Sequence, residues 1–153
     1  MSRFIDSVVQ SYQEKESRPV NSIPKTLLHV GCGLAKIADL KGFNRNEWCE
    51  IRLDIDNKVQ PDIIGTLTDL SGVKSESVDV VYSSHSIEHI FSHEVPSALK
   101  EFKRVLKLDG FALIFCPDMR YICQVIAAGG LTETLYESPK GPITPLDVMY
   151  GHG

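Results

Sequence analysis

Two glycines and an aspartate in the first half of the chain have the types and the spacing to hold a nucleoside. Gly31 and Gly33 follow directly after an apolar run in the stretch KTLLHVGCGLAK, residues 25–36. A glycine turn after a buried strand lets the backbone approach a ligand with no Cβ in the way. Asp54, in IRLDID, comes about 20 residues later, where a carboxylate is suited to bind ribose hydroxyls.

The same pattern departs from a dinucleotide site at one position. Lys36 stands where the third glycine of GxGxxG would be. Because that glycine serves close packing around a pyrophosphate, a single nucleoside is favoured over a dinucleotide. Asp56 competes with Asp54 for the ribose; we prefer Asp54, because it directly follows the apolar run and so lies at the carboxyl end of the predicted strand.

Three histidines, His85, His89 and His93, recur every four residues in SHSIEHIFSHE. On one continuous helix, successive pairs would share a face and could bind zinc. A new helix starting after Ser92 is the better interpretation, because Pro96 suits the first turn of a helix. We therefore predict that these histidines form no metal site.

The elements that would position these residues alternate along the chain. Helices are predicted at residues 4–16, 95–106 and 119–128, the second of them ended by Asp109-Gly110. Nearly uninterrupted apolar strands separated by helix-length segments indicate a parallel sheet covered on both faces. The fold class is therefore α/β, doubly wound and mostly parallel, with strands predicted at 26–30, 50–53, 62–64, 78–82 and 111–116.

Composition limits the classes of function. The chain has 153 residues, is 42% hydrophobic and carries a net charge of -4, so it offers no electrostatic footprint for nucleic acid. No apolar run approaches the roughly 20 residues needed to cross a bilayer. The amino terminus is too polar for a signal peptide, and a cytoplasmic location is predicted by default.

Two further groups of residues receive structural interpretations. The basic residues Lys100, Lys103, Arg104 and Lys107 are expected on the solvated face of their helix, not in a nucleic-acid patch. The four cysteines show no metal-ligand spacing and are predicted to be free, buried thiols. These cysteines are Cys32, Cys49, Cys116 and Cys123.

At this point the sequence resembles a known family. The segments LLHVGCG, LDID, VDVVYSSHSIEHI and LKEFKRVLKLDGFALIFCPD resemble the successive motifs of class I S-adenosylmethionine-dependent methyltransferases, from about Lys25 to Asp118. The resemblance implies a Rossmann-like fold that binds S-adenosyl-L-methionine and releases S-adenosyl-L-homocysteine. The implied cofactor-binding residues are Gly31, Cys32, Gly33, Asp54, Ile55, Thr66, Leu67, Asp69, Ser83 and His85.

By the same resemblance, the glycines pass under the methionine portion of the cofactor, residues 65–69 flank the adenine, and residues 83–85 line the pocket. Two positions depart from the family pattern. His29 stands where the family usually has an acid, which leaves the cofactor's ammonium group without its customary indirect support. Thr66 stands where an adenine-contacting acid is common, so Asp69 or only backbone is expected to meet the adenine amino group.

Methyl transfer asks little of the protein, because the sulfonium is already activated and positioning supplies most of the rate. The catalytic residue is therefore left unknown, with His85, Asp118 and Tyr121 as candidates. We predict a methyltransferase acting on a small molecule or a carbohydrate-linked acceptor. The alternative is a non-catalytic or assembly-dependent module with the same fold, and a nucleotide-sugar or dinucleotide enzyme is disfavoured by Lys36.

The carboxyl-terminal segment differs from the family pattern. We divide the chain into an N-terminal helix and linker (1–24), the cofactor-binding core (25–118) and a C-terminal helix with an irregular tail (119–153). The family usually adds two more strands after the fifth, but nothing in the tail alternates like a strand hairpin. The fold is therefore expected to be incomplete, with the edge at 111–116 paired in a homodimer or covered by the tail.

Overall fold

The structure, a computed structural model, describes residues 24–138 and 141–151. The helix predicted at residues 4–16 lies outside this range. The chain divides into two compact units, of which the first ends at Phe115 and the second comprises Cys116–Gly153. No helix in the described ranges is long and apolar enough to cross a membrane.

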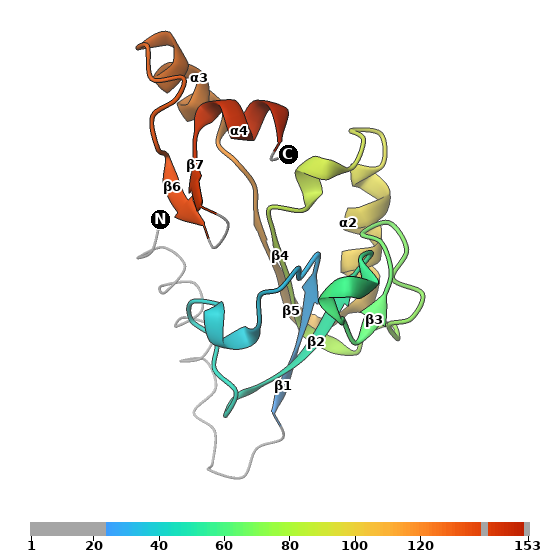
Figure 1. Cartoon of the computed structure of the whole chain (residues 1–153). Coiled ribbons are helices and arrows are strands. Elements are labelled where there is room, and N and C mark those ends of the chain that lie inside the picture. The colour runs from blue at the N-terminus through green and yellow to red at the C-terminus, as the bar shows by residue number, and fades with distance from the viewer. Residues whose placement is uncertain (1–23, 139–140, 152–153) are drawn as a thin grey trace. The chain divides into compact units, whose positions relative to one another are not determined.

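The first unit is built on a five-stranded sheet in the order β3-β2-β1-β4-β5 (Figure 1). All four strand pairings are parallel, which confirms the predicted α/β fold class. The strand order reverses between β1 and β4, and in such sheets ligands bind beyond the carboxyl ends at this switch point. The strands are β1 (Lys25–Val30), β2 (Trp48–Asp54), β3 (Ile63–Ile64), β4 (Val78–Ser84) and β5 (Leu106–Phe115).

One α-helix and three short 3-10 helices connect these strands. The α-helix α2 (Val95–Val105) begins with Pro96 in its first turn, as the sequence predicted. The 3-10 helices are η1 (Ile37–Asp39), η2 (Asn57–Val59) and η3 (Ile87–His89). Because η3 ends before α2 begins, the three histidines do not lie on one continuous helix.

The core lies on both faces of the sheet, because successive residues of a strand point in opposite directions. On one face, Leu28 belongs to a buried cluster that includes Phe102 and Val105 of α2. On the other face, Leu27 belongs to a cluster with Ile37 and Trp48. Both faces of β1 are therefore excluded from solvent, as expected for the central strand of a parallel sheet.

The predicted end of α2 at Asp109-Gly110 is wrong. The helix ends at Val105, and β5 begins at once, with Leu106 paired to Val78. The register then jumps, because the next partners are Val80 and Phe111. Gly110 fits this irregular stretch because a Cβ there would lie 2.9 Å from the carbonyl oxygen of Asp79.

The second unit contains α3 (Met119–Ala127), β6 (Tyr136–Ser138), β7 (Gly141–Ile143) and α4 (Pro145–Tyr150). The predicted helix after the fifth strand is confirmed. The statement that the tail holds no hairpin is wrong, because β6 and β7 pair antiparallel. At three residues each, these strands are too short to show an alternating pattern in the sequence.

The prediction for the cysteines is half right. All four are free, but Cys32 alone is buried, whereas Cys49, Cys116 and Cys123 are exposed. Cys49 lies in β2 beside the buried Trp48, and adjacent residues of a strand point to opposite faces. Cys116 follows the end of β5, and Cys123 lies on an exposed part of α3.

Candidate functional site

The turn after β1 needs a glycine at position 31 for two reasons. Gly31 has a φ of 65°, a conformation that other residues rarely adopt. A Cβ on Gly31 would also collide with the Ser86 side chain, which donates a hydrogen bond to the Gly31 carbonyl oxygen over 3.3 Å. The turn after β1 and the segment after β4 are thus in direct contact.

Gly33 plays a different part in the same turn. Its φ is 51°, and a Cβ there would have no atom within 4 Å, so the backbone borders open space. The Gly33 amide donates a 2.7 Å hydrogen bond to Oδ2 of Asp54, the last residue of β2. The structure therefore brings together the glycine turn and the carboxylate that the sequence singled out by its spacing.

The two competing aspartates have different surroundings. Oδ1 of Asp54 accepts from the Asp56 amide over 2.9 Å, so the carboxylate is oriented by two backbone donors. Asp56 instead accepts from the Lys58 amide and caps η2, and its side chain is exposed. Each carboxylate oxygen has two acceptor positions, which leaves Asp54 capacity for two further donors.

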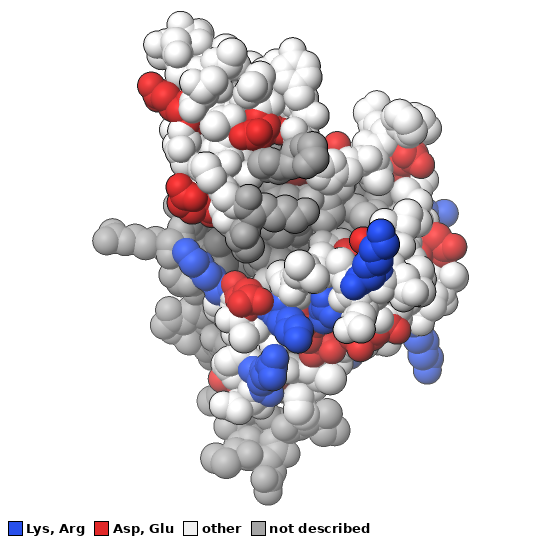
Figure 2. Space-filling model, in the orientation of Figure 1, with Lys and Arg blue, Asp and Glu red and all other residues white. Residues whose placement is uncertain are grey.

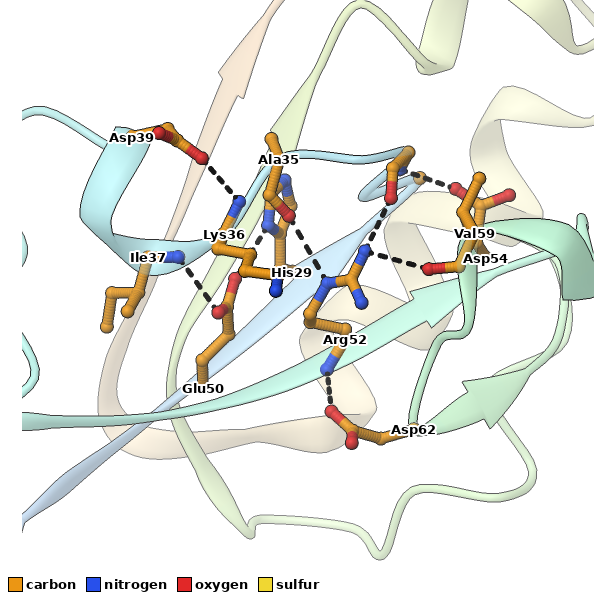
Figure 3. Close-up of polar contacts among 12 residues, drawn as sticks. His29, Ala35, Lys36, Ile37, Asp39, Glu50, Arg52, Asp54, Val59 and Asp62 are labelled. Atoms are coloured by element: carbon orange, nitrogen blue, oxygen red, sulfur yellow. Dashed lines mark hydrogen bonds and ion pairs between the residues drawn. The ribbon is translucent and has the colours of Figure 1, made fainter.

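Two charged residues of β2 that the sequence argument did not select also lie at this turn (Figure 3). Glu50 and Arg52 precede Asp54 at intervals of two, so all three point to one face of the sheet. The Glu50 carboxylate accepts from the Ile37 amide and from His29, and Arg52 binds backbone carbonyls of the turn. The alternation EIRLD was the available signal, but backbone partners leave no mark in a sequence.

His29 is the residue that stands where the family usually has an acid. It is 2% exposed, and its Nδ1 lies 2.9 Å from Oε1 of Glu50. Burial lowers the pKa of the imidazole, and the hydrogen bond and charge of Glu50 partly oppose this. An acid is thus present beside this position, supplied by the neighbouring strand.

Cys32, between the two glycines, is also buried. Its amide and that of Gly31 both donate to the carbonyl oxygen of Leu53, over 3.2 and 2.9 Å. Burial raises the pKa of the Cys32 thiol, which therefore stays protonated near neutral pH. Cys32 contributes its backbone to the turn and has no features of a nucleophile.

The segment predicted to flank the adenine begins next to Asp54. The Gly65 amide donates to the Asp54 carbonyl oxygen over 3.0 Å, and Thr66 forms a bridge with Asp69. Leu67 packs against the buried core. Asp69 is exposed, and hydrogen bonds from Ser71 lower the pKa of its carboxyl group.

After β4, the predicted pocket residues differ in accessibility. Ser83 is fully buried, and its Oγ has no hydrogen-bond partner in the described structure. The half-exposed His85 has a φ of 53°, and its Nδ1 lies 3.4 Å from Oε1 of Glu88. Of these two residues, His85 is therefore the one whose side chain reaches solvent.

The other candidates for catalysis belong to the second unit. Asp118 caps α3, and its carboxylate accepts from the amides of Arg120 and Tyr121. This capping role accounts for Asp118 without any catalytic function. Tyr121 is 56% exposed.

Charged residues of both signs are interspersed on the face of the molecule shown in Figure 2. The basic residues predicted to be solvated differ in their contacts. Arg104 binds Glu101 and two backbone carbonyls, and Lys107 lies in β5, where it pairs with Asp79 over 2.8 Å. Within residues 24–138 and 141–151, no cluster of three or more potential metal ligands occurs.

The geometry at the carboxyl ends of β1 and β2 suits a nucleoside with an attached flexible group. Gly33 offers backbone beside open space, and Asp54 offers an oriented carboxylate with unused acceptor positions. Two exposed apolar side chains, Leu34 and Ile55, lie next to these residues in the chain, at 75% and 72% exposure. Apolar surface beside a carboxylate is what a base attached to a ribose would contact.

Comparison with known proteins places this geometry in a family. A family model described as a methyltransferase domain matches residues 28–114, which contain the glycine turn, Asp54 and the segment after β4. None of the curated proteins compared matches the chain.

Solved structures with the same fold come from several archaea. An S-adenosylmethionine-dependent methyltransferase from Archaeoglobus fulgidus aligns with a TM-score of 0.53 and 16% identity, over 98% of this chain and 66% of that one. A protein from Pyrococcus horikoshii gives a TM-score of 0.53 and 19% identity over 90% and 65% of the two chains.

A candidate S-adenosyl-L-methionine-dependent methyltransferase from Methanococcus maripaludis gives a TM-score of 0.51 and 14% identity over 74% and 61%. The chain thus spans less than two thirds of the length of these structures. At such identities they show the fold alone, whereas the family model covers more than half of the chain. The chain belongs to the methyltransferase-domain family and has the class I, Rossmann-like fold of S-adenosylmethionine-dependent methyltransferases.

Proposed function

We propose that this chain binds S-adenosyl-L-methionine at the carboxyl ends of β1 and β2 and serves methyl transfer to a small-molecule or carbohydrate-linked acceptor. The observation that carries the proposal is the contact between the Gly33 amide and the Asp54 carboxylate. It joins a turn that borders open space to an oriented acid, within the region matched by the family model.

In this proposal the cofactor, when bound, supplies an activated methyl group, and the chain's own residues orient it. Asp54 accepts hydrogen bonds from the two ribose hydroxyls. The turn of Gly31, Cys32 and Gly33 passes under the methionine portion, and Ile55 covers the base. We assign no catalytic base, because an aligned methyl group needs one only when the acceptor must lose a proton.

The remaining predicted residues lie around the base and at the entrance of the proposed cofactor pocket. Thr66, Leu67 and Asp69 flank the adenine through the segment that starts beside Asp54, and the exposed side of His85 lies at the mouth of the pocket. Ser83 is fully buried near the end of β4, so we assign it no direct contact with the cofactor.

Charge disfavours one class of acceptor, nucleic acid. The chain has a net charge of -4, and basic and acidic residues are mixed on the face in Figure 2, which does not favour a nucleic-acid backbone. Transfer of a radiolabelled methyl group into small-molecule and glycan fractions, but not into RNA, would support this acceptor class. Labelled RNA would contradict it.

Calorimetric titration with S-adenosyl-L-homocysteine tests the cofactor site, with NAD as the competing ligand class. We expect the product to bind and Asp54→Ala to weaken it by about 1.5 to 3 kcal/mol, roughly 10- to 150-fold, because charge-assisted hydrogen bonds are lost. The matched control is Asp56→Ala, which removes an exposed carboxylate two residues away. Unfolding curves of all variants show whether they are folded.

The outcomes separate the alternatives. Equal losses in the two variants would overturn the assignment of Asp54. Binding of NAD in preference to S-adenosyl-L-homocysteine would indicate a dinucleotide enzyme. Failure to bind either ligand would indicate a non-catalytic or assembly-dependent module that retains the fold.

A further inference from the structure

Arg52 of β2 makes an unusual set of contacts, because its guanidinium donates four hydrogen bonds in the described structure and all of them go to backbone carbonyl oxygens. Figure 3 shows Arg52 with Ala35 and Val59, two of the residues that accept these bonds. Nη2 donates to Gly33 over 2.5 Å and to Val59 over 3.3 Å. Nε donates to Ala35 over 3.2 Å, and Nη1 to Gln60 over 2.9 Å. One side chain therefore joins the glycine turn to the turn that follows β2.

The Gly33 residue is held on both sides by β2. Its amide donates to Asp54, and its carbonyl accepts from Arg52, two residues earlier on the same face of the strand. A glycine in the left-handed region has no side chain whose contacts could restrict its backbone conformation. The hydrogen bonds with Asp54 and Arg52 restrict the backbone of Gly33 instead.

The second turn is held in a similar way. Gln60 ends η2 with a φ of 51° and a ψ of 60°, a left-handed conformation that costs free energy for a residue with a Cβ. The hydrogen bonds from Arg52 to the Gln60 and Val59 carbonyls restrain this conformation. Segments 31–35 and 56–60 are thus coupled through one guanidinium, and each also donates a backbone amide to the Asp54 carboxylate.

The chemistry of arginine suits this task. Its guanidinium is planar, stays charged and presents five N–H donors in a fixed fork, whereas lysine presents a single flexible ammonium. The Arg52 amide also donates to Oδ2 of Asp62 over 2.8 Å, which fixes the strand from which the fork extends.

We infer that Arg52 is a positioning residue for the cofactor: it locks the two turns so that Asp54 and the Gly33 backbone are held in the binding geometry before the ligand arrives. The inference rests on the proposed function. A residue that only stabilised the fold would lower the free energy of unfolding and leave the affinity of the folded protein unchanged. A positioning residue changes the affinity of a fully folded protein.

Calorimetry with S-adenosyl-L-homocysteine on the intact chain tests this inference. Arg52→Met is expected to weaken binding at least 10-fold at a temperature where unfolding curves show it folded. Arg52→Lys should restore little of the lost affinity, because the contacts require the several N–H donors of the planar guanidinium and not only a positive charge. The control is Lys58→Met, which removes an exposed charge from the same turn and should leave the affinity within about twofold.

A double-mutant cycle shows through which residue Arg52 acts. In the background of Asp54→Asn, Arg52→Met should cost much less than in the wild type, because the placement of Asp54 is what Arg52 provides. Hydrogen exchange without ligand should speed up in both turns of Arg52→Met and stay unchanged in β1 and β4.

The failures are distinguishable. A wild-type chain that does not bind S-adenosyl-L-homocysteine would overturn the proposed function and this inference with it. Wild-type binding that Arg52→Met leaves unchanged, or additive losses in the double-mutant cycle, would overturn this inference alone.

Discussion

His29 occupies a position where the family usually has an acid, but a carboxylate still lies beside this position. The sequence predicted a site that lacks indirect support for the cofactor's ammonium group. The Glu50 carboxylate lies 2.9 Å from the imidazole, on the next strand. The rings of Tyr82 and His29 pack in a T-shaped arrangement, with their centroids 5.1 Å apart.

The buried imidazole predicts a dependence of stability on pH. Burial lowers the pKa of His29 below its ordinary 6.5, so the unfolded chain binds the proton more readily than the folded one. The contribution of the neutral His29 imidazole to the free energy of unfolding is fully present above about pH 6.5. It is lost as the pH falls towards the pKa of His29 in the folded state. Denaturant unfolding between about pH 5 and 7 should show a steeper fall for the wild type than for His29→Asn.

An exposed histidine provides the control for this measurement. His93→Asn should retain the pH dependence of the wild type, since the slope is assigned to the buried ring. If His29→Asn and the wild type lose stability in parallel as the pH falls, the assignment to His29 is wrong.

At the scale of single residues, sequence spacing predicted which residues contact one another only where a motif was present. The glycine turn and Asp54 were found because their types and separation are characteristic, and they are in contact. Arg52 and Ser86 were missed because their acceptors are backbone carbonyls, which every residue carries. The ribose role of Asp54 stays a prediction.

At the scale of elements, α2 is held at its carboxyl end by an ion pair of Glu101 with Arg104, a residue that the sequence analysis assigned to the solvated face. Arg104 binds both Glu101 oxygens over 2.7 Å and the carbonyls of Leu70 and Val73 over 2.8 and 3.0 Å. Oε2 of Glu101 also accepts from the Leu70 amide over 3.0 Å. The pair thereby attaches α2 to the segment between β3 and β4.

Removing this attachment should destabilise the fold. We expect Arg104→Ala to lower the free energy of unfolding by about 1 to 2 kcal/mol, a value reduced because the pair is partly exposed. Lys103→Ala, one residue earlier and exposed, should change it by less than about 0.5 kcal/mol. Chemical denaturation of the two variants makes the comparison, and equal effects would contradict the structural role of Arg104.

Elements were predictable where they are long and periodic. The helix at 95–106 and the central strands follow the hydrophobic pattern closely. The passage from α2 to β5 was not predictable, because the strand pairing of Leu106 with Val78 overrides the local preference of LKLDG for a helix end or turn. The β6–β7 hairpin was missed because three-residue strands carry too few positions for a period.

At the scale of the whole molecule, β5 is one of the two edge strands of the five-stranded sheet, and β3 is the other. The last four residues of β5, Ala112 to Phe115, are apolar and carry no charge that would discourage pairing. We propose that a second copy of the chain pairs with this edge in a two-fold homodimer.

The homodimer can be tested in solution. Light scattering should give twice the mass of the chain, and hydrogen exchange at residues 112–115 should slow as the protein concentration rises. Asp or Lys in place of Ala112, which is exposed on this strand, would act as a probe that weakens pairing. A monomer in which these amides exchange rapidly at all concentrations would exclude this arrangement.

The contacts that hold Gly33 also bear on the order in which the molecule assembles. The side-chain contacts from β2 to the glycine turn span 17 to 21 residues, whereas the contact between Ser86 and Gly31 spans 55. Short loops close at a lower entropic cost, and a chain made on the ribosome folds from its amino terminus. We therefore expect the β2 side of the glycine turn to form while the segment carrying β4 is still being synthesised, and the Ser86 side to close onto it afterwards.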